Sequence, residues 1–306
     1  MGSHAARIPG EGFTAAEAGR VMSAACRSAG LDGEGAELIR LGENALFRLA
    51  SEPVIVRVAR SSDYLPSVRK EVAVARWLHR EGFPAGRVVE NLEQPVVVDG
   101  HPVTFWHLIR GDDRKPTYGE LGALLRELHG LTPPAGLDLP PYDAFGRSAL
   151  RIERAPGIPE DDRRFLRALH AELRDAVTEL RFGSPRGPVH GDAHVQNLMV
   201  DDKGQAVFID FEGFSFDHPE WDLKVTTVEH QSLGWQTPEQ FADFVSAYGR
   251  DLREWSGYPT LRRIQEFTMT TWLMQNASTG GRPAEEYARR IASLRDENAP
   301  RDWRPL

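Results

Sequence analysis

One segment constrains this chain more than any other, because it joins two polar loops through a β-hairpin pattern. The first loop begins with His190, continues through Asp192 and ends at Asn197. Two short apolar runs separated by a turn follow, and Asp210 comes thirteen residues after Asn197. A hairpin of this kind brings its two ends together. We therefore expect both polar loops to lie on one side of a cleft.

The side chains in these loops suit phosphoryl transfer. Mg²⁺ prefers oxygen ligands and is usually held by one or two protein groups together with substrate phosphates. The reaction also needs a carboxylate that orients the attacking hydroxyl. We interpret Asp192 as the catalytic base and Asn197 and Asp210 as catalytic metal ligands. The alternative is that these residues only cap turns. It stays open if either loop is considered alone, but the presence of both loops at this spacing argues against it.

A buried carboxylate is expected in the predicted helix over 66–81. Glu71 shares the apolar helix face with Val68 and Leu78, where an unpaired carboxylate costs several kcal/mol. Arg57 lies in an otherwise apolar strand pattern and can supply the cation. Kinases use such a pair, usually with lysine, to reach the nucleotide phosphates. A purely structural ion pair is the alternative.

The periodicity predicts an α+β fold in two parts. With 306 residues the chain exceeds the roughly 250 that one core usually serves. Residues 1–110 are expected to form an antiparallel-sheet lobe and 111–306 a mainly helical lobe, with 1–4 set aside as a possible tag remnant. Apolar alternation marks strands over 38–41, 46–49, 54–58, 96–98 and 103–109. Helices are expected over 14–30, 66–81, 160–181, 237–249, 259–278 and 283–296, another begins at Thr117 and includes Leu128, and 132–159 is expected to be irregular.

Composition excludes several classes of protein. A single cysteine, Cys26, excludes an internal disulfide framework and a cysteine-based zinc site. The net charge of −8 argues against nucleic-acid binding, and no apolar run is long enough to span a membrane. No secretory signal is evident, so we expect a cytoplasmic protein. His190 and His194 have a zinc spacing, but they lie in a loop without an intervening glutamate.

These motifs resemble the aminoglycoside phosphotransferase and choline kinase family, whose fold is similar to that of protein kinases. The resemblance runs from Leu38 to the region of Asp222 and is carried by His190-Gly191-Asp192, Asn197 and Ile209-Asp210-Phe211-Glu212. It implies ATP or GTP as the phosphoryl donor and Mg²⁺ as the cofactor. It also implies roles for further residues: Arg57 with Glu71 at the nucleotide phosphates, Gly42 and Asn44 in the nucleotide loop, Trp106, His107 and Leu108 as the hinge against the base, and His190 and Asp222 as support for the catalytic loop.

Two departures from the family pattern stand out. Arg57 takes the place of the commoner lysine, and these two cations are not interchangeable where they touch phosphate. The turn at Gly42 carries a single glycine, so a plain hairpin turn is an equal reading of it.

The acidic surplus is concentrated in one stretch. Residues 201–255 hold twelve acidic and four basic side chains, a difference equal to the net charge of the whole chain. We expect this stretch to form the acceptor side of the cleft, with Glu212, Glu220 and Glu229 facing a cationic acceptor. The alternative is that these acids are solvated turn and cap residues.

The sequence thus predicts a Mg²⁺-dependent phosphotransferase acting on a small-molecule hydroxyl. The expected acceptor is an amine-bearing compound such as an aminoglycoside or related antibiotic, which would give antibiotic resistance. Alternatives are a kinase of a primary-metabolite alcohol or of a peptide Ser/Thr, and a non-catalytic kinase-like binding protein. Neither a nucleic-acid nor a membrane partner is expected, and the sequence is silent on oligomeric state.

Overall fold

The computed structural model describes residues 13–42, 44–111, 114–278, 280–296 and 298–305. The expected tag remnant, Glu43 of the turn and Asp112-Asp113 of the linker lie outside these ranges. The chain forms two compact units. The first comprises 1–115, 134–138 and 199–212, and the second comprises 116–133, 139–198 and 213–306.

The first unit is built on a five-stranded antiparallel sheet in the order β1-β2-β3-β5-β4. All five predicted strands are present: β1 (Glu37–Leu41), β2 (Asn44–Arg48), β3 (Val54–Ala59), β4 (Val96–Val98) and β5 (His101–His107). The two predicted helices of this part are also present, as α1 (Ala15–Ala29) and α2 (Leu65–Arg80), with a 3₁₀ turn at Ser62–Tyr64 before α2.

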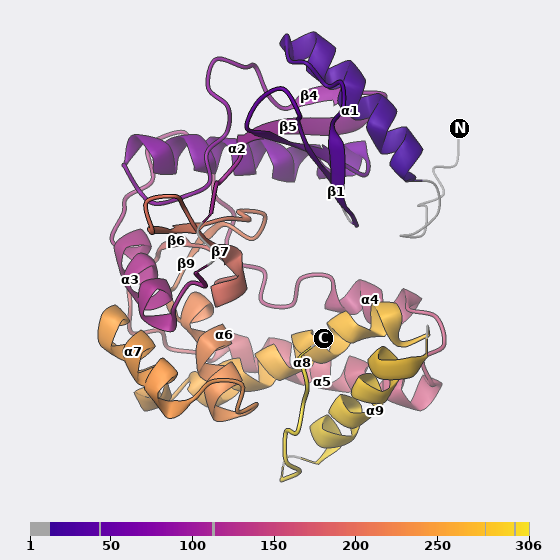
Figure 1. The fold of residues 1–306 in the computed structure, drawn as a ribbon. Coiled ribbons are helices and arrows are strands. Elements are labelled where there is room, and N and C mark those ends of the chain that lie inside the picture. The colour runs from indigo at the N-terminus through magenta and orange to yellow at the C-terminus, as the bar shows by residue number, and fades with distance from the viewer. Residues whose placement is uncertain (1–12, 43, 112–113, 279, 297, 306) are drawn as a thin grey trace. The chain divides into compact units, whose positions relative to one another are not determined.

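The two helices lie on opposite faces of the sheet (Figure 1). Successive strand residues point to opposite faces. Val56 and Val58 of β3 are fully buried in the core that α1 completes. Arg57 between them points the other way and meets Glu71 of α2. Because of this alternation, an otherwise apolar strand presents one charged side chain, Arg57, to helix α2.

The predicted hairpin between the two polar loops is present as β7 (Leu198–Val200) and β8 (Ala206–Phe208). Its second strand is joined to the first unit by backbone hydrogen bonds. Gly86 N donates to Phe208 O over 2.7 Å, and Phe208 N donates to Pro84 O over 3.0 Å. Residues 199–212, which include Asp210, are therefore part of the first unit.

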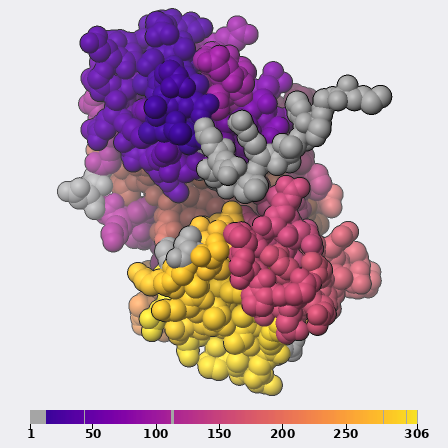
Figure 2. Space-filling view, turned by 90° about the vertical axis from the view of Figure 1, so that its right-hand side faces the viewer, coloured from indigo at the N-terminus to yellow at the C-terminus, as the bar shows by residue number. Residues whose placement is uncertain are grey.

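The second unit is mainly helical, as predicted. Its helices are α3 (Tyr118–His129), α4 (Ser148–Arg154), α5 (Glu160–Thr178), α6 (Glu220–Gln231), α7 (Pro238–Tyr248), α8 (Tyr258–Ala277) and α9 (Gly281–Arg295). A two-stranded sheet pairs β6 (Gly187–Val189) with β9 (Ser215–Asp217), and 3₁₀ turns span Val195–Asn197 and Leu252–Glu254. Helices α4, α5, α6 and α9 pack against α8, and Figure 2 shows the α4–α5 segment beside the C-terminal segment.

Five of the seven helices given above for this unit were predicted, and two were missed. Reciprocal capping boxes open α3 at Thr117 and α7 at Thr237. Helix α4 lies inside the stretch predicted to be irregular, and α6 had no predicted helix at all. Helix α6 was not predicted because every residue from Glu220 to Val228 is buried, so the sequence of this segment has no apolar stripe beside a polar face.

None of the helices in the described ranges is long and apolar enough to cross a membrane.

Candidate active site

The loop that carries Asp192 is held at its base by Asp222 of α6. His190 N donates to one carboxylate oxygen of Asp222 over 2.7 Å, and Gly191 N donates to the other over 2.8 Å. Asp222 is fully buried. Burial raises its pKa, but the hydrogen bond from His129, together with the charge of His190 and the backbone hydrogen bond from Gly191, lowers the pKa below its usual value. The position of the residue fits the supporting role that the resemblance implies.

Gly191 allows the loop to approach the backbone of Gly213 closely. Its φ is +84°, a conformation that side chains with a Cβ rarely adopt. A Cβ at this position would lie 2.1 Å from the carbonyl oxygen of Gly213. The close approach of two backbones therefore requires glycine here.

Asp192 and Asn197 are brought together within this loop. The Asn197 amide nitrogen donates to the Asp192 backbone oxygen over 2.8 Å and to the Asp192 carboxylate over 3.2 Å. No donor in the described ranges reaches the Asn197 side-chain oxygen, so it is turned away from Asp192 and can act as a ligand. The Asp192 side chain is 61% exposed at the tip of the loop.

The charge of Asp192 is maintained by histidines. The surrounding protein raises its pKa, but His194, whose Nε2 lies 3.5 Å from the carboxylate, together with the charge of His190, lowers the pKa below its usual value. Asp192 is therefore ionised at neutral pH and can accept a hydrogen bond from a hydroxyl group.

Glu229 of α6 lies in the same electrostatic neighbourhood. Burial raises its pKa, a hydrogen bond from Gln236 over 3.0 Å lowers it, and the charges of His194 and Asp192 also act on it. Of the three acids expected on the acceptor side, Glu229 is the one whose pKa is affected by the charge of Asp192.

Glu220 is a correction to the sequence prediction. Its side chain is fully buried, accepts a hydrogen bond from Arg250 over 2.7 Å and accepts another from Ser184 over 3.1 Å. A carboxylate that is buried and paired in this way stabilises the packing of α6 and does not face an acceptor.

In the first unit, Arg57 is the centre of a group of polar side chains. Its Nη1 donates to Glu71 over 2.5 Å, so the predicted ion pair forms, and its Nη2 lies 3.6 Å from Glu212. With the Asn44 amide turned so that its oxygen faces Arg57, that oxygen accepts from Nη2 over 2.8 Å and from Nε over 3.1 Å. Glu212, expected on the acceptor side, is thus a neighbour of Arg57.

Burial dominates the titration of Glu71, whose side chain is 2% exposed. It raises the pKa of Glu71 to about 7, against the lowering effect of Arg57, while the charges of Glu212 and Asp210 raise it further. Lys70, the residue before it, donates from Nζ to the backbone oxygen of Glu212 over 2.7 Å. Helix α2 is therefore connected to the segment around Asp210 by a direct contact.

Asp210 stands at the end of β8 in an unusual conformation. Its φ is +66°, which only a few per cent of non-glycine residues adopt. Its side chain is exposed, and no hydrogen bond or ion pair engages it in the described part of the chain. An exposed, unpaired carboxylate is a suitable ligand for a divalent cation.

The remaining residues expected at the nucleotide lie in the same unit. The Trp106 indole donates to Thr104 over 2.8 Å, and His107 Nε2 lies 2.6 Å from a Glu90 oxygen. Leu108 N donates to the backbone oxygen of Pro53 over 2.8 Å. Gly42 is held at the first turn by Arg60, which donates to the Gly42 carbonyl over 2.9 Å.

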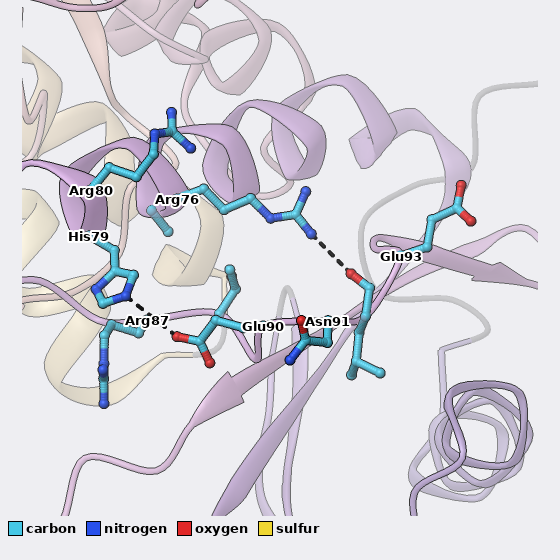
Figure 3. Close-up of a pocket in the computed structure, with 10 residues that line it drawn as sticks. Arg76, His79, Arg80, Arg87, Glu90, Asn91 and Glu93 are labelled. Carbon is cyan, nitrogen blue, oxygen red and sulfur yellow. Dashed lines mark hydrogen bonds and ion pairs between the residues drawn. The ribbon is translucent and has the colours of Figure 1, made fainter.

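A pocket of about 490 Å³ also lies in this unit, along α2 and the segment before β4 (Figure 3). It contains none of the expected site residues. The guanidinium groups of Arg76, Arg80 and Arg87 point in three different directions, and Glu90 lies between them, 3.7 Å from His79. The cations do not converge, so the lining does not form an anion site.

The described residues hold no group of three or more His, Cys, Asp or Glu side chains arranged for a metal. The side-chain oxygens of Asn197 in the second unit and of Asp210 in the first unit are each of the hard type that Mg²⁺ prefers.

Sequence reasoning missed two residues of this site, His129 and Tyr248. His129 contacts Asp222 and Tyr248 through its two ring nitrogens. The only signal in the sequence was a histidine in the last turn of an apolar helix, which usually indicates a favourable interaction with the helix dipole.

Comparisons with known proteins bear on the family and the fold of the chain. Residues 38–262 match the family model described as the phosphotransferase enzyme family. No curated protein matches the chain. Among solved structures, an amicoumacin kinase in complex with AMP-PNP, Ca²⁺ and Ami is 16% identical with a TM-score of 0.67, over 89% of this chain and 91% of the other.

Two further structures are similar at the same level. A microcompartment-associated aminopropanol kinase is 20% identical with a TM-score of 0.64, covering 85% and 90%. A choline/ethanolamine kinase family protein from Mesorhizobium loti is 18% identical with a TM-score of 0.61, covering 92% and 93%. The kinase-like fold class predicted from the sequence is confirmed. Because the family model covers most of its length, the chain belongs to the phosphotransferase enzyme family.

Proposed function

We propose that this protein transfers the γ-phosphoryl group of ATP or GTP to a hydroxyl of a small molecule, with an amine-bearing acceptor such as an aminoglycoside or related antibiotic preferred. The observation that carries the proposal is the Asp192 loop. It presents an exposed, ionised carboxylate on a backbone fixed by Asp222 and leaves the Asn197 oxygen available.

In this mechanism Asp192 accepts the proton of the acceptor hydroxyl as its oxygen bonds to the γ-phosphorus. The bond from that phosphorus to the β–γ bridging oxygen breaks, and the nucleoside diphosphate leaves with that oxygen. Arg57, oriented by Glu71 and Asn44, contacts the nucleotide phosphates, and residues 106–108 contact the base. Asn197 and Asp210 would hold Mg²⁺, which supplies charge neutralisation on the transferred phosphate.

The amine preference is supported by Glu229. It is mostly buried, its pKa is raised by that burial, and the charges of Asp192 and His194 act on it. A carboxylate in this position gains from an ammonium group that replaces lost hydration. Three of the similar structures are described as an amicoumacin kinase, a spectinomycin phosphotransferase and an aminopropanol kinase, and aminopropanol carries an amine.

The test is nucleotide consumption with a panel of amine alcohols, neutral alcohols and Ser-containing peptides. Turnover with an amine alcohol should fall by about 10²–10⁴-fold in Asp192→Ala. Asp202→Ala, which removes an exposed acid from the turn between β7 and β8, is the matched control and should keep wild-type turnover. Near wild-type turnover in Asp192→Ala would reject the base assignment.

The alternatives are separated by the same panel and by thermal shift. Turnover with neutral alcohols or peptides alone would favour the primary-metabolite or peptide kinase. Absence of stabilisation by ATP or GTP in the presence of Mg²⁺ would favour a non-catalytic binding protein.

A further inference from the structure

A buried chain of side chains connects α7, α3 and α6 to the base of the Asp192 loop. His129, the last residue of α3, has a side chain only 6% exposed. Its Nε2 lies 3.0 Å from Asp222, and its Nδ1 lies 3.0 Å from the Tyr248 hydroxyl. The same Asp222 oxygen that faces His129 accepts the hydrogen bond from His190 N. His129 therefore touches the group that holds the loop and has no contact with the loop's carboxylate itself.

The proton positions in this chain follow from the chemistry of its partners. An ionised carboxylate can only accept hydrogen bonds, so the nitrogen of His129 that faces Asp222 must carry a proton. Burial and the charge of Asp222 raise the pKa of Tyr248, so its hydroxyl keeps the proton that it can donate to the other ring nitrogen. The three groups thus form one directed series of hydrogen bonds that ends on Asp222.

Asp222 depends on all of its donors because it is fully buried. The backbone amides of His190 and Gly191 supply two hydrogen bonds, and His129 supplies the third. Without the imidazole, the carboxylate oxygen shared with His190 loses a donor, and the carboxylate can rotate away from the two loop amides. The Asp192 loop would then lose its fixed position while its own residues stay intact.

The packing of α3 on α7 holds this geometry. Gly122 of α3 lies against the α7 backbone, where a Cβ would come 2.5 Å from the Phe244 oxygen and 3.2 Å from Tyr248 N. About two turns further along α3, His129 meets Tyr248 edge to face, with ring centroids 5.6 Å apart. The approach of the two helices thus fixes the distance between the hydroxyl and the imidazole.

We propose that His129 is a positioning residue for the phosphotransfer reaction, acting through Asp222 to fix the loop that carries Asp192. This proposal rests on the proposed function for its kinetic part and on the structure alone for its effect on the loop. Tyr248 sets the orientation of the imidazole.

The test compares His129→Gln with His129→Asn. The glutamine amide nitrogen can occupy the place of Nε2 and donate to Asp222, whereas the shorter asparagine amide reaches only the place of Nδ1. We expect kcat to fall by about 10–100-fold in His129→Asn and by less than about threefold in His129→Gln. KM for nucleotide and acceptor should stay within about twofold in both, because His129 touches neither substrate.

A role in packing alone would lower kcat equally in both variants, in line with their loss of thermal stability, and that result would overturn the proposal. Tyr248→Phe keeps His129 and Asp222 and removes one hydroxyl, so it covers the case in which the histidine variants do not fold. The loss of one hydrogen bond should lower kcat by about fivefold at unchanged KM. An unchanged kcat in Tyr248→Phe would contradict the orienting role.

Hydrogen exchange separates this proposal from the proposed function. The amides of His190 and Gly191 should exchange faster in His129→Asn than in His129→Gln or the unmodified protein, whether or not an acceptor is known. If the protein phosphorylates no acceptor, the proposed function fails and the exchange measurement still decides the role of His129. Equal exchange in all three proteins would overturn it.

Discussion

At the scale of single residues, Arg57 shows how one cation can serve several partners. It is 16% exposed, its Nη1 meets Glu71, and its Nη2 lies near both Glu212 and Asn44. A lysine has one compact ammonium group and cannot keep this set of contacts. The side chains around Arg57 therefore suit the arginine that departs from the family pattern. A nucleotide phosphate would displace Glu212 and Asn44 from the Arg57 guanidinium more easily than the buried Glu71.

The Arg57–Glu71 pair can be measured by a double-mutant cycle. Arg57→Met leaves a buried carboxylate without its cation and should lower the free energy of unfolding by about 2–4 kcal/mol. Arg57→Met combined with Glu71→Leu removes the orphaned charge and should recover most of that loss. Urea unfolding of the four proteins gives the coupling. Additive losses would mean that the two side chains do not depend on each other.

The raised pKa of Glu71 predicts a pH dependence of stability. Its folded-state pKa is about 7, against about 4.5 for the free side chain, so the folded state binds the proton more tightly. The resulting stabilisation is fully present below pH 4.5 and is lost as the pH rises through 7. Relative to Glu71→Gln, the wild-type free energy of unfolding should fall between pH 5.5 and pH 8.5. A difference that stays constant or grows with pH would show that Arg57 controls the titration instead.

Gly191 gives a prediction with a matched control in Gly204. Both have positive φ, +84° and +76°, but a Cβ at Gly204 meets nothing within 4 Å. Gly204→Ala should cost only the backbone strain, about 1–2 kcal/mol. Gly191→Ala adds a clash with the Gly213 oxygen and should cost clearly more, with loss of turnover. Equal losses of thermal stability would mean that the loop can move away from Gly213.

At the scale of helices and strands, the elements found from sequence were those with one buried face. Helices α1 and α2 carry their buried residues at helical spacing, and the strands of the first unit are short and mainly apolar, so these elements were predicted to within about two residues. Helix α6 was not, because it is buried on all sides and carries Asp222 in its first turn. The sequence could identify Asp222 only by resemblance, and it could not identify His129, since a long-range contact between α3 and α6 leaves no periodic signal.

The close approach of α3 and α7 predicts opposite effects for two glycines in one helix. Alanine normally favours a helix over glycine by about 1 kcal/mol. At Gly119 a Cβ would have neighbours at 3.7 Å or more, so Gly119→Ala should be neutral or stabilising. At Gly122 it would meet the Phe244 oxygen at 2.5 Å, so Gly122→Ala should lose about 1–3 kcal/mol. Guanidinium unfolding of both variants checks this, and a stabilised Gly122→Ala would show that α7 can shift freely.

At the scale of the whole molecule, the acidic surplus of residues 201–255 is divided among different tasks. Glu220 is paired with Arg250, Asp222 holds a loop, and Asp251 is paired with Arg253. Counting charges along the sequence could not show this, because pairing depends on partners distant in the chain. Three of the twelve acids are therefore engaged within the protein, and Asp210 and Glu229 are the acids of this stretch that the functional proposal uses.

This division predicts that the KM of the acceptor depends more on where an acidic side chain lies than on the total charge of the protein. Glu229→Gln and Glu239→Gln each remove one negative charge, but Glu239 lies exposed in the first turn of α7. If the acceptor amine contacts Glu229, its KM should rise by about tenfold or more in Glu229→Gln, as expected for a hydrogen bond to a charged group, and stay unchanged in Glu239→Gln. Exposed charges are screened beyond about 8 Å at physiological ionic strength, so a general field effect would raise KM in both variants and vanish in high salt. Steady-state kinetics with an amine alcohol and a neutral alcohol, at low and high salt, separates the two cases. The KM of the neutral alcohol should not change in either variant.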